Sequence, residues 1–342
     1  MNPVRRRTLQ AALGALLLPA SAWSQPGSGS ETLIRVNIPG PHSLPFLPID
    51  LIPALNFDHE VGARLAIRYQ PSGIRAIEDV LAGNADLAAL GFATLPVLHS
   101  KGKDVIAISP LSGRTPPMGL VLHKDLAKKI RSVADLKGRT IATSTGSVNS
   151  KTYLQMVAQA VLRASGVADN EVRWLPSAQN WDSISGAMIS KACDAVFCEE
   201  PFFSRLVLQG HGVILADLAD PRMAGKISGL NHIRSAIVTT RTLTRSQPEK
   251  MELLVRMLRR TLVWIQATPP EQVAQKAPAK SAAERFEIAE LLRKMPGIFN
   301  PDGRFSVPQI AETDVFLRAA MPELKLAAAD SLIDDRWAGR RQ

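Results

Sequence analysis

The sequence contains no arrangement of residues that is typical of a catalytic centre. Its six histidines are scattered, and none stands in an HExxH or HxxxH pattern for metal binding. A GxSxG motif for a nucleophilic serine is also missing. The segment Thr145–Thr152 ends in Lys-Thr like a phosphate-binding loop, but Thr145 and Ser150 occupy the positions that require glycine. We therefore expect no catalytic residue, no metal site and no cofactor.

The two cysteines, Cys193 and Cys198, flank a predicted strand. Five residues of extended chain rise by roughly 16 Å, which is too far for a disulfide. Two cysteines also cannot supply a pair of CxxC motifs for zinc. We expect both to be buried as small apolar residues.

Polar, glycine and aromatic residues follow directly after several predicted strands, where they can hold a small molecule. Thr145–Ser147 stands between a predicted strand and a helix, so Gly146 permits close approach to the backbone. Gly91 and Thr94 hold the matching place in the first half. The candidate ligand-binding residues are His42, Ser43, Gly91, Phe92, Thr94, Thr145, Gly146, Ser147, Asn149, Asn180, Trp181 and Glu200.

These candidates also have purely structural interpretations. Ser147 or Asn149 can cap the following helix instead of donating to a ligand. Phe92 and Trp181 can stack on a planar ligand or pack in a core, and His42 has no visible partner, which suits a surface position. Both interpretations therefore stay open for each residue.

Two adjacent acids, Glu199 and Glu200, follow a predicted strand and precede Pro201. They can open a helix, whose N-terminus favours negative charge. One of them can instead accept hydrogen bonds from an amine or a ring N–H of a solute, with Arg114 as an opposing charge. A pair of acids at this place argues against plain sulfonate or nitrate as the solute.

The first residues have the three parts of a secretory signal. Arg5, Arg6 and Arg7 precede the apolar run Leu9–Ala22, which is too short to span a membrane, and small residues follow it. Arg6-Arg7-Thr8-Leu9 also fits a twin-arginine signal, so the twin-arginine and general export routes both stay open. No cysteine lies near the cleavage region, so we expect a free periplasmic protein rather than a lipoprotein.

The chain carries a net charge of +10, which by itself suggests a nucleic-acid partner. Three of these charges belong to the expected export signal, and their removal leaves +7. The remaining basic residues form no dense run, so we expect no nucleic-acid partner. The length of 342 residues, 46% of them apolar, predicts a large core and about two domains.

Short apolar runs alternate with helical patterns from residue 32 onward, which predicts βαβ units and mainly parallel sheets. The first series of predicted strands is Leu33–Ile38, Ala66–Tyr69, Leu87–Leu90 and Val105–Ser109, with helices over Ile74–Leu81 and Thr94–His99. The second series of predicted strands is Thr140–Thr143, Val172–Leu175 and Ala195–Cys198, with helices over Thr152–Arg163 and Ile184–Ile189. Later helices are predicted over Glu249–Ala267, Ala282–Lys294 and Pro308–Ala319.

The two series resemble one another. The segments Arg68–Gly73 and Arg173–Ala178 share an R-aromatic-x-P-S-like pattern, 105 residues apart. Asp86–Ala88 and Asp194–Val196 match at an offset of 108, which is also the offset of the opening strands. We interpret this pattern as an internal duplication. If two such units face each other, strand ends and helix N-termini converge on one cleft that suits a small, often anionic solute.

In several stretches the sequence resembles the periplasmic solute-binding proteins of the nitrate, sulfonate, taurine and thiamine-precursor class, which serve ABC importers. The likeness covers most of the chain from residue 32 to 319. The stretches that carry it are Leu81–Asp86 with Leu90-Gly91, Ser132–Ala142, Thr145–Ser147, Cys193–Val196 with Glu199–Pro201, and Leu262–Ala267 with Pro269.

This resemblance implies an α/β fold of the two-lobed periplasmic binding protein type (type II). Each lobe would be a mainly parallel sheet flanked by helices, and the lobes would close around a solute by a hinge motion. The implied divisions are a signal peptide over 1–24, a flexible leader over 25–30, a first lobe over 31–113 and 231–342, and a second lobe over 114–230.

The resemblance further implies capture of a sulfonate-, nitrate-, pyrimidine- or carboxylate-like small organic solute and its delivery to an ABC permease by the lobe surfaces. We expect a periplasmic monomer that binds no nucleic acid. Two alternatives stay open: a non-transport enzyme of the same fold, and a ligand-loaded partner of a membrane sensor. The pyrimidine synthases of this fold carry a cysteine-rich motif that the present chain lacks.

Overall fold

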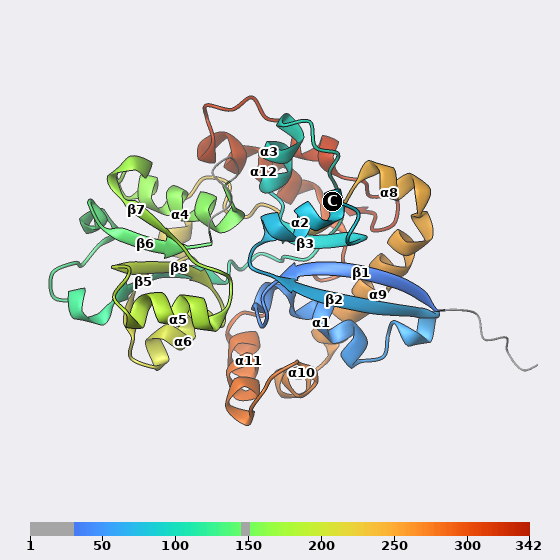
Figure 1. Cartoon of the computed structure of the whole chain (residues 1–342), viewed down its shortest axis with the longest axis horizontal. Helices are drawn as coiled ribbons and strands as arrows, with labels where there is room; N and C mark the ends of the chain where they lie inside the picture. Colours follow the sequence, from blue (N-terminus) through green and yellow to red (C-terminus); the bar gives the residue numbers. More distant parts are fainter. Residues whose placement is uncertain (1–30, 145–150) are drawn as a thin grey trace, which may run out of the picture. The chain divides into compact units, whose positions relative to one another are not determined.

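A computed structural model of the chain describes residues 31–144 and 151–342. The predicted signal peptide and leader lie outside the described residues. Two five-stranded sheets organise the described part (Figure 1). The strands of the first sheet are β1 (Thr32–Pro39), β2 (Ala63–Gln70), β3 (Leu87–Gly91), β4 (Ile106–Pro110) and β10 (Ser235–Thr239). The strands of the second are β5 (Met118–His123), β6 (Thr140–Thr143), β7 (Arg173–Pro176), β8 (Ala195–Glu199) and β9 (Gly212–Asp217).

Helices surround the two sheets, and a short strand pair lies near the carboxyl end of the chain (Figure 1). The helices before residue 230 are α1 (Leu47–Ala54), α2 (Gly73–Leu81), α3 (Thr94–Ser100), α4 (Tyr153–Ala164), α5 (Trp181–Ile189), α6 (Phe202–Leu208) and α7 (Pro221–Ala224). The later helices are α8 (Arg241–Ser246), α9 (Pro248–Ala267), α10 (Pro270–Lys276), α11 (Ala282–Lys294) and α12 (Val307–Ala320). The short strand pair is β11 (Phe305–Ser306) and β12 (Arg340–Arg341).

Both sheets have the same pattern of strand directions. In the first, with the order β2-β1-β3-β10-β4, β1 is parallel to β2 and β3, whereas β10 is antiparallel to β3 and β4. In the second, with the order β7-β6-β8-β5-β9, β6 is parallel to β7 and β8, whereas β5 is antiparallel to β8 and β9. In each sheet, the antiparallel strand is the one that the chain forms directly after it crosses over from the other sheet: β5 follows β4, and β10 follows β9.

The repeat found in the sequence occupies equivalent places in the two sheets. Asp86 precedes β3, and its carboxylate accepts the backbone N–H of Arg35 at 2.8 Å. Asp194 precedes β8, and its carboxylate accepts the backbone N–H of Thr140 at 2.8 Å. Because both aspartates tie a parallel strand to its neighbour at the same topological position, the structure supports the interpretation of a duplicated unit.

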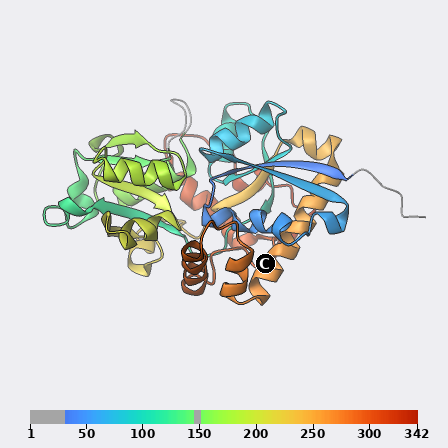
Figure 2. The same ribbon diagram turned by 60° about the horizontal axis from the view of Figure 1, so that its bottom comes forward.

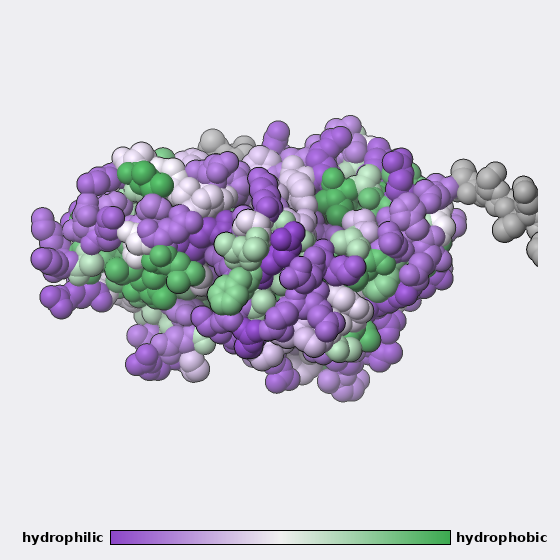
Figure 3. All heavy atoms as spheres, turned by 90° about the horizontal axis from the view of Figure 1, so that it is seen from below, coloured by the Kyte–Doolittle hydropathy of each residue, from purple (hydrophilic) through white to green (hydrophobic). Residues whose placement is uncertain are grey.

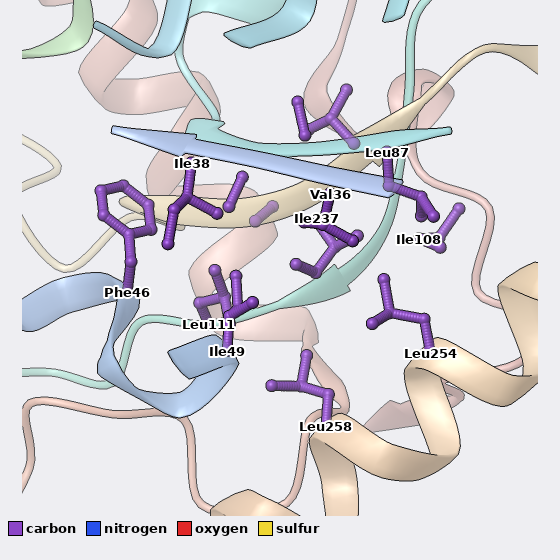
Figure 4. Close-up of a cluster of buried hydrophobic side chains, with 14 of the residues drawn as sticks. Val36, Ile38, Phe46, Ile49, Leu87, Ile108, Leu111, Ile237, Leu254 and Leu258 are labelled. Carbon is purple, nitrogen blue, oxygen red and sulfur yellow. The ribbon is translucent and has the colours of Figure 1, made fainter. Parts of the chain in front are cut away.

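The first hydrophobic core fills the space between the first sheet and helices α1 and α9 (Figure 4). Val36 of β1 and Ile237 of β10 lie on one side of it, and Leu254 and Leu258 of α9 lie on the other. Four-residue spacing places both leucines on one helical face, which is buried, while Arg256 is exposed to solvent. Burial of this face holds α9 against the sheet.

The second sheet is covered on both faces, because side chains alternate in direction along a strand. On one face, Phe197 of β8 packs with Leu154 and Val157 of α4. On the other face, Val196 of β8 packs with Ile184 of α5 and with α6. Cys193 and Cys198 are buried in this second cluster as free thiols, as the sequence predicted.

Most predicted elements are confirmed within three residues, and Thr140–Thr143 and Ala282–Lys294 have the predicted bounds. No ranges were predicted for strands β5, β9, β10, β11 and β12 or for helices α1, α6, α7, α8 and α10. Proline disfavours a helix interior. Pro48 lies in the first turn of α1, where no intrahelical N–H is needed, but Pro53 lies inside the helix, one residue before its end. The strands β5 and β10 are fully buried, so they lack the alternating polar pattern that identifies a strand.

The chain crosses between the two cores more than once. Leu111 and Ile233 belong to the first core, whereas Met118 and Leu230 belong to the second. Helices α9 to α11 contribute to the first core, but Phe316 of α12 packs in the second. The residue boundaries of the lobes given above stay a prediction.

Candidate functional site

A narrow cavity lies between the two sheets, at the carboxyl ends of their central strands. Pro39 ends β1, Gly91 ends β3 and Glu199 ends β8, and all three residues line the cavity. The first residues of α2, α3 and α4 line it too, so the partial positive charge of three helix N-termini lies beside it. Most of the remaining lining is apolar, with Phe46 and Met118 among its members. Such a lining with a few polar groups is typical of a small-molecule site.

Glu199 places a buried carboxylate in this cavity. The Ser43 hydroxyl donates to Glu199 Oε2 at 3.0 Å, and the Gln179 side-chain amide donates to the same oxygen at 3.1 Å. Among the described residues, Oε1 has no hydrogen-bond donor. Burial raises the pKa of Glu199 to about 7, although the bonds from Ser43 and Gln179 favour the ionised form. The carboxyl can therefore accept or donate a proton near neutral pH.

Arg234 supplies the opposite charge in the cavity lining. Its Nη atoms donate to the backbone carbonyls of Gly113, Arg114 and Thr115 at 2.5 to 3.1 Å. Its Nε is buried without a hydrogen-bond partner among the described residues, and the same holds for the Ser235 hydroxyl. Burial lowers the pKa of Arg234 to about 10, while the neighbouring Glu199 carboxylate raises it. Arg234 thus ties together the two crossing segments and leaves donor groups near the cavity.

Tyr153 and His232 form a buried pair beside the cavity. His232 Nδ1 lies 2.7 Å from the Gly229 carbonyl, so it donates there, and Nε2 accepts from the Tyr153 hydroxyl at 3.0 Å. Burial lowers the pKa of His232 to about 3, so the ring is neutral at physiological pH. The His232 ring also stacks on Phe316, with the ring centroids 4.0 Å apart. This pair fixes the start of α4 at the cavity.

Three of the residues predicted from the sequence meet at this cavity. Gly91 and Thr94 line it, and Ser43 reaches it through its bond to Glu199. Contrary to the ligand-binding prediction, Phe92 does not line the cavity. Its ring is fully buried in the first core. An aromatic side chain at this strand end buries its whole ring by packing in the core.

The other predicted residues lie elsewhere. His42 lines a separate small pocket with Arg205, and Asn180 caps α5 by accepting the Ser183 backbone N–H at 3.0 Å. Trp181 packs against the buried cluster that contains Val196 and Ile184, on the face of the second sheet covered by α5 and α6. Glu200 accepts the Ser204 backbone N–H at 3.0 Å at the start of α6, which is the structural interpretation given above for an acid at this place. The remaining four candidates, Thr145, Gly146, Ser147 and Asn149, lie outside the described residues.

Sequence reasoning missed six polar residues of the cavity lining: Ser112, Thr152, Tyr153, Gln179, Arg234 and Ser235. Arg234 directly precedes the buried strand β10, and a charged residue beside a continuous apolar run is the signal that identifies it. Tyr153 looks in sequence like any apolar residue of an amphipathic helix. Within residues 31–144 and 151–342, no group of three or more His, Cys, Asp or Glu side chains is placed to hold a metal ion.

A sequence profile described as NMT1/THI5 like matches residues 56–272. This match spans more than half of the chain, so the chain belongs to the NMT1/THI5-like family. A comparison with curated proteins gave no significant match. The family is therefore established by the profile, in agreement with the resemblance seen in the sequence.

Solved structures share the fold at low sequence identity. A protein from Bordetella bronchiseptica is 21% identical, with a TM-score of 0.80 over 90% of this chain and 96% of its own. The periplasmic aliphatic sulphonate binding protein SsuA from Escherichia coli is 17% identical, with a TM-score of 0.62 over 91% and 94%. The desulfurization enzyme DszB is 15% identical, with a TM-score of 0.57 over 90% and 97%. The predicted two-lobed periplasmic binding protein fold is thus confirmed.

Proposed function

We propose that this chain is an extracytoplasmic solute-binding protein, which captures a small organic solute between its lobes and delivers it to an ABC importer. The observation that carries the proposal is the placement of Glu199 and Arg234 in one apolar cavity, where the two sheets meet. Each of these groups keeps a polar atom without a partner among the described residues. A bound solute would satisfy those atoms, and the two sheets would close over it.

The polar groups of the cavity indicate the chemistry of the solute. Glu199 Oε1 accepts a hydrogen bond from an N–H or O–H group of a solute, whereas Arg234 Nε and the Ser235 hydroxyl donate to an acceptor. The charges of Glu199 and Arg234 oppose each other, so a solute with both a donor and an acceptor fits better than nitrate or a plain sulfonate. An isolated anion would lie beside the Glu199 carboxylate at a cost in free energy.

The buried thiols support binding rather than catalysis. Both cysteines are buried, and burial raises the pKa of Cys193 to about 12, so neither provides a thiolate nucleophile at neutral pH. The Tyr153–His232 pair is likewise neutral and hydrogen-bonded within the fold. The proposal includes a periplasmic location after signal cleavage, a permease as the membrane partner, and a monomeric state.

Thermal-shift and calorimetric titration of the mature chain tests the proposal. The compounds are nitrate, taurine, aliphatic sulfonates, aminopyrimidines and small amino carboxylates. A solute at about 100 times its dissociation constant adds about 2.7 kcal/mol to the free energy of unfolding. We expect compounds with both a donor and an acceptor to raise the melting temperature more than nitrate does.

The variant Glu199→Gln links binding to the cavity, and Glu252→Gln on the exposed face of α9 is its matched control. Glu199→Gln should weaken the best compound by about tenfold or more, because a charge-assisted hydrogen bond is lost. The control should bind like the unaltered chain. If no compound class shifts the melting curve and one of them is instead converted to product, the binding-protein proposal is wrong.

A further inference from the structure

A cluster of charged side chains outside the cavity joins the two lobes. Arg205 lies on α6, which packs on the second sheet through Phe202. Glu284 and Glu287 lie on α11, which packs in the first core through Leu291. Helices α6 and α11 lie side by side in both ribbon views, with α11 in orange-brown (Figures 1 and 2). The contact therefore spans elements that belong to different sheets.

The guanidinium of Arg205 holds the Glu287 carboxylate with a fork of donors. Nε donates to Glu287 Oε2 at 3.0 Å, and Nη2 donates to the same oxygen at 2.5 Å. Nη1 lies 3.6 Å from Glu284 Oε1. The side chains of Arg205 and Glu287 are only 13% and 12% exposed. A bidentate pair with this burial is a stronger interaction than a surface ion pair, because water screens it less.

Each partner also interacts with side chains of its own lobe. Trp181 of α5 lies under the Arg205 guanidinium, 5.2 Å from it, and so holds the arginine on the second lobe. Glu284 and Glu287 are three residues apart on one helix, so two negative charges share a face of α11. Their mutual repulsion is relieved when Arg205 arrives between the lobes. The attraction therefore acts only when the lobes are together.

This cluster acts through closure and not through contact with the solute. Arg205 lies outside the lining of the Glu199 cavity. Two titratable residues, Glu200 and His42, lie near the charged cluster. We propose that Arg205 and Glu287 form an interlobe latch, which keeps the closed arrangement populated even without solute. The inference rests on the proposed function, in which closure retains the solute.

Distances between the lobes test the latch in the solute-free mature chain. Arg64 on β2 and Lys128 after β5 are exposed positions on the two sheets, and each is replaced by cysteine to carry a spin label. The native thiols stay unlabelled because both are buried and burial raises their pKa. Pulsed electron resonance then gives the populations of short and long distances.

We expect Arg205→Gln and Glu287→Gln each to lower the ratio of closed to open chains by about tenfold, since a partly buried charge loses its partner. The double variant should lie no lower than the single ones, because the two residues act as one pair. Arg222→Gln is the matched control. Its side chain is 90% exposed and pairs with Asp220 within the same lobe, so the ratio should not change.

A solute-free chain without a short-distance population overturns the latch. So do variants that leave the distances unchanged, or a double variant with additive losses. Circular dichroism confirms that each variant is folded, and Glu287→Gln preserves side-chain shape on an outer helix. Because the readout needs no solute, a negative result in the compound panel and an absent latch are separate outcomes.

Discussion

At the residue scale, the contribution of Glu199 to the free energy of unfolding depends on whether its carboxyl is protonated. Its carboxyl is buried, and burial raises its pKa to about 7, while the unfolded chain ionises it near 4.5. The folded chain therefore holds a proton between these two values that the unfolded chain has released. Stability from this group is present at pH below 4.5 and is lost as the pH rises to about 7.

Glu199→Gln should be as stable as the unaltered chain at pH 4.5 and more stable at pH 8. The expected gap at pH 8 is about 3 kcal/mol, because the amide carries no charge that must be buried. Urea unfolding from pH 4.5 to 8 measures it. Comparing the two chains cancels the opposite contribution of His232, whose pKa is lowered to about 3. A gap that stays constant across this range would contradict the assignment of a raised pKa to Glu199.

At the element scale, the start of α4 sits directly on the end of β3. A Cβ atom added at Gly91 would lie 2.0 Å from Tyr153 Cβ and 2.3 Å from its Cγ. These atoms are next to the backbone and are held by the Tyr153–His232 bond, so they have little room to shift. Glycine is thus needed at position 91, because strand β3 of the first sheet packs closely against α4, which covers the second sheet.

Gly91→Ala should destabilise the chain by about 3 kcal/mol, because the extra methyl group forces α4 away from β3. Gly186→Ala is the matched control, since a Cβ at Gly186 in α5 meets no atom within 4 Å. That control should gain about 0.5–1 kcal/mol from helix propensity. Chemical denaturation measures both, and equal stability of the two variants would show that α4 tolerates displacement.

At the scale of the whole molecule, the last part of the chain contributes to both cores, and helix α12 packs in the second core after α9 to α11 have packed in the first. Phe316 of α12 is fully buried there against His232, although α9 to α11 pack in the first core. On the face that Figure 3 shows, green apolar patches are separated by polar residues. No helix in the described part of the chain combines the length and apolar character needed to cross a membrane.

Phe316→Ala should lower the free energy of unfolding by about 3–5 kcal/mol, because it leaves a cavity between α12 and the second core. Phe286→Ala on α11 is the control, since that ring is 68% exposed and its removal should cost less than about 1 kcal/mol. Urea midpoints give both values. A loss for Phe316→Ala as small as that of the control would mean that α12 is not part of the second core.

Local signals predicted much of the fold and part of the cavity. Apolar periodicity located α4, α9 and α11, and the repeated aspartates predicted the equivalence of β3 and β8. Gly91 and Ser43 were identified because residues after parallel strands meet at one edge. Phe92 lies in the core, which is the structural alternative left open for it, since sequence position does not tell whether a side chain points to the core or to the cleft.

The sequence by itself determined the α/β class, the duplicated unit and the family, because these depend on local periodicity and on short motifs in a fixed order. Only the tertiary structure brought Arg234 beside Glu199 and Arg205 against Glu287. Each pair joins residues that are far apart in sequence and come from elements on different sheets. Their contacts depend on how the chain crosses between the sheets, and no local pattern of residues encodes that crossing.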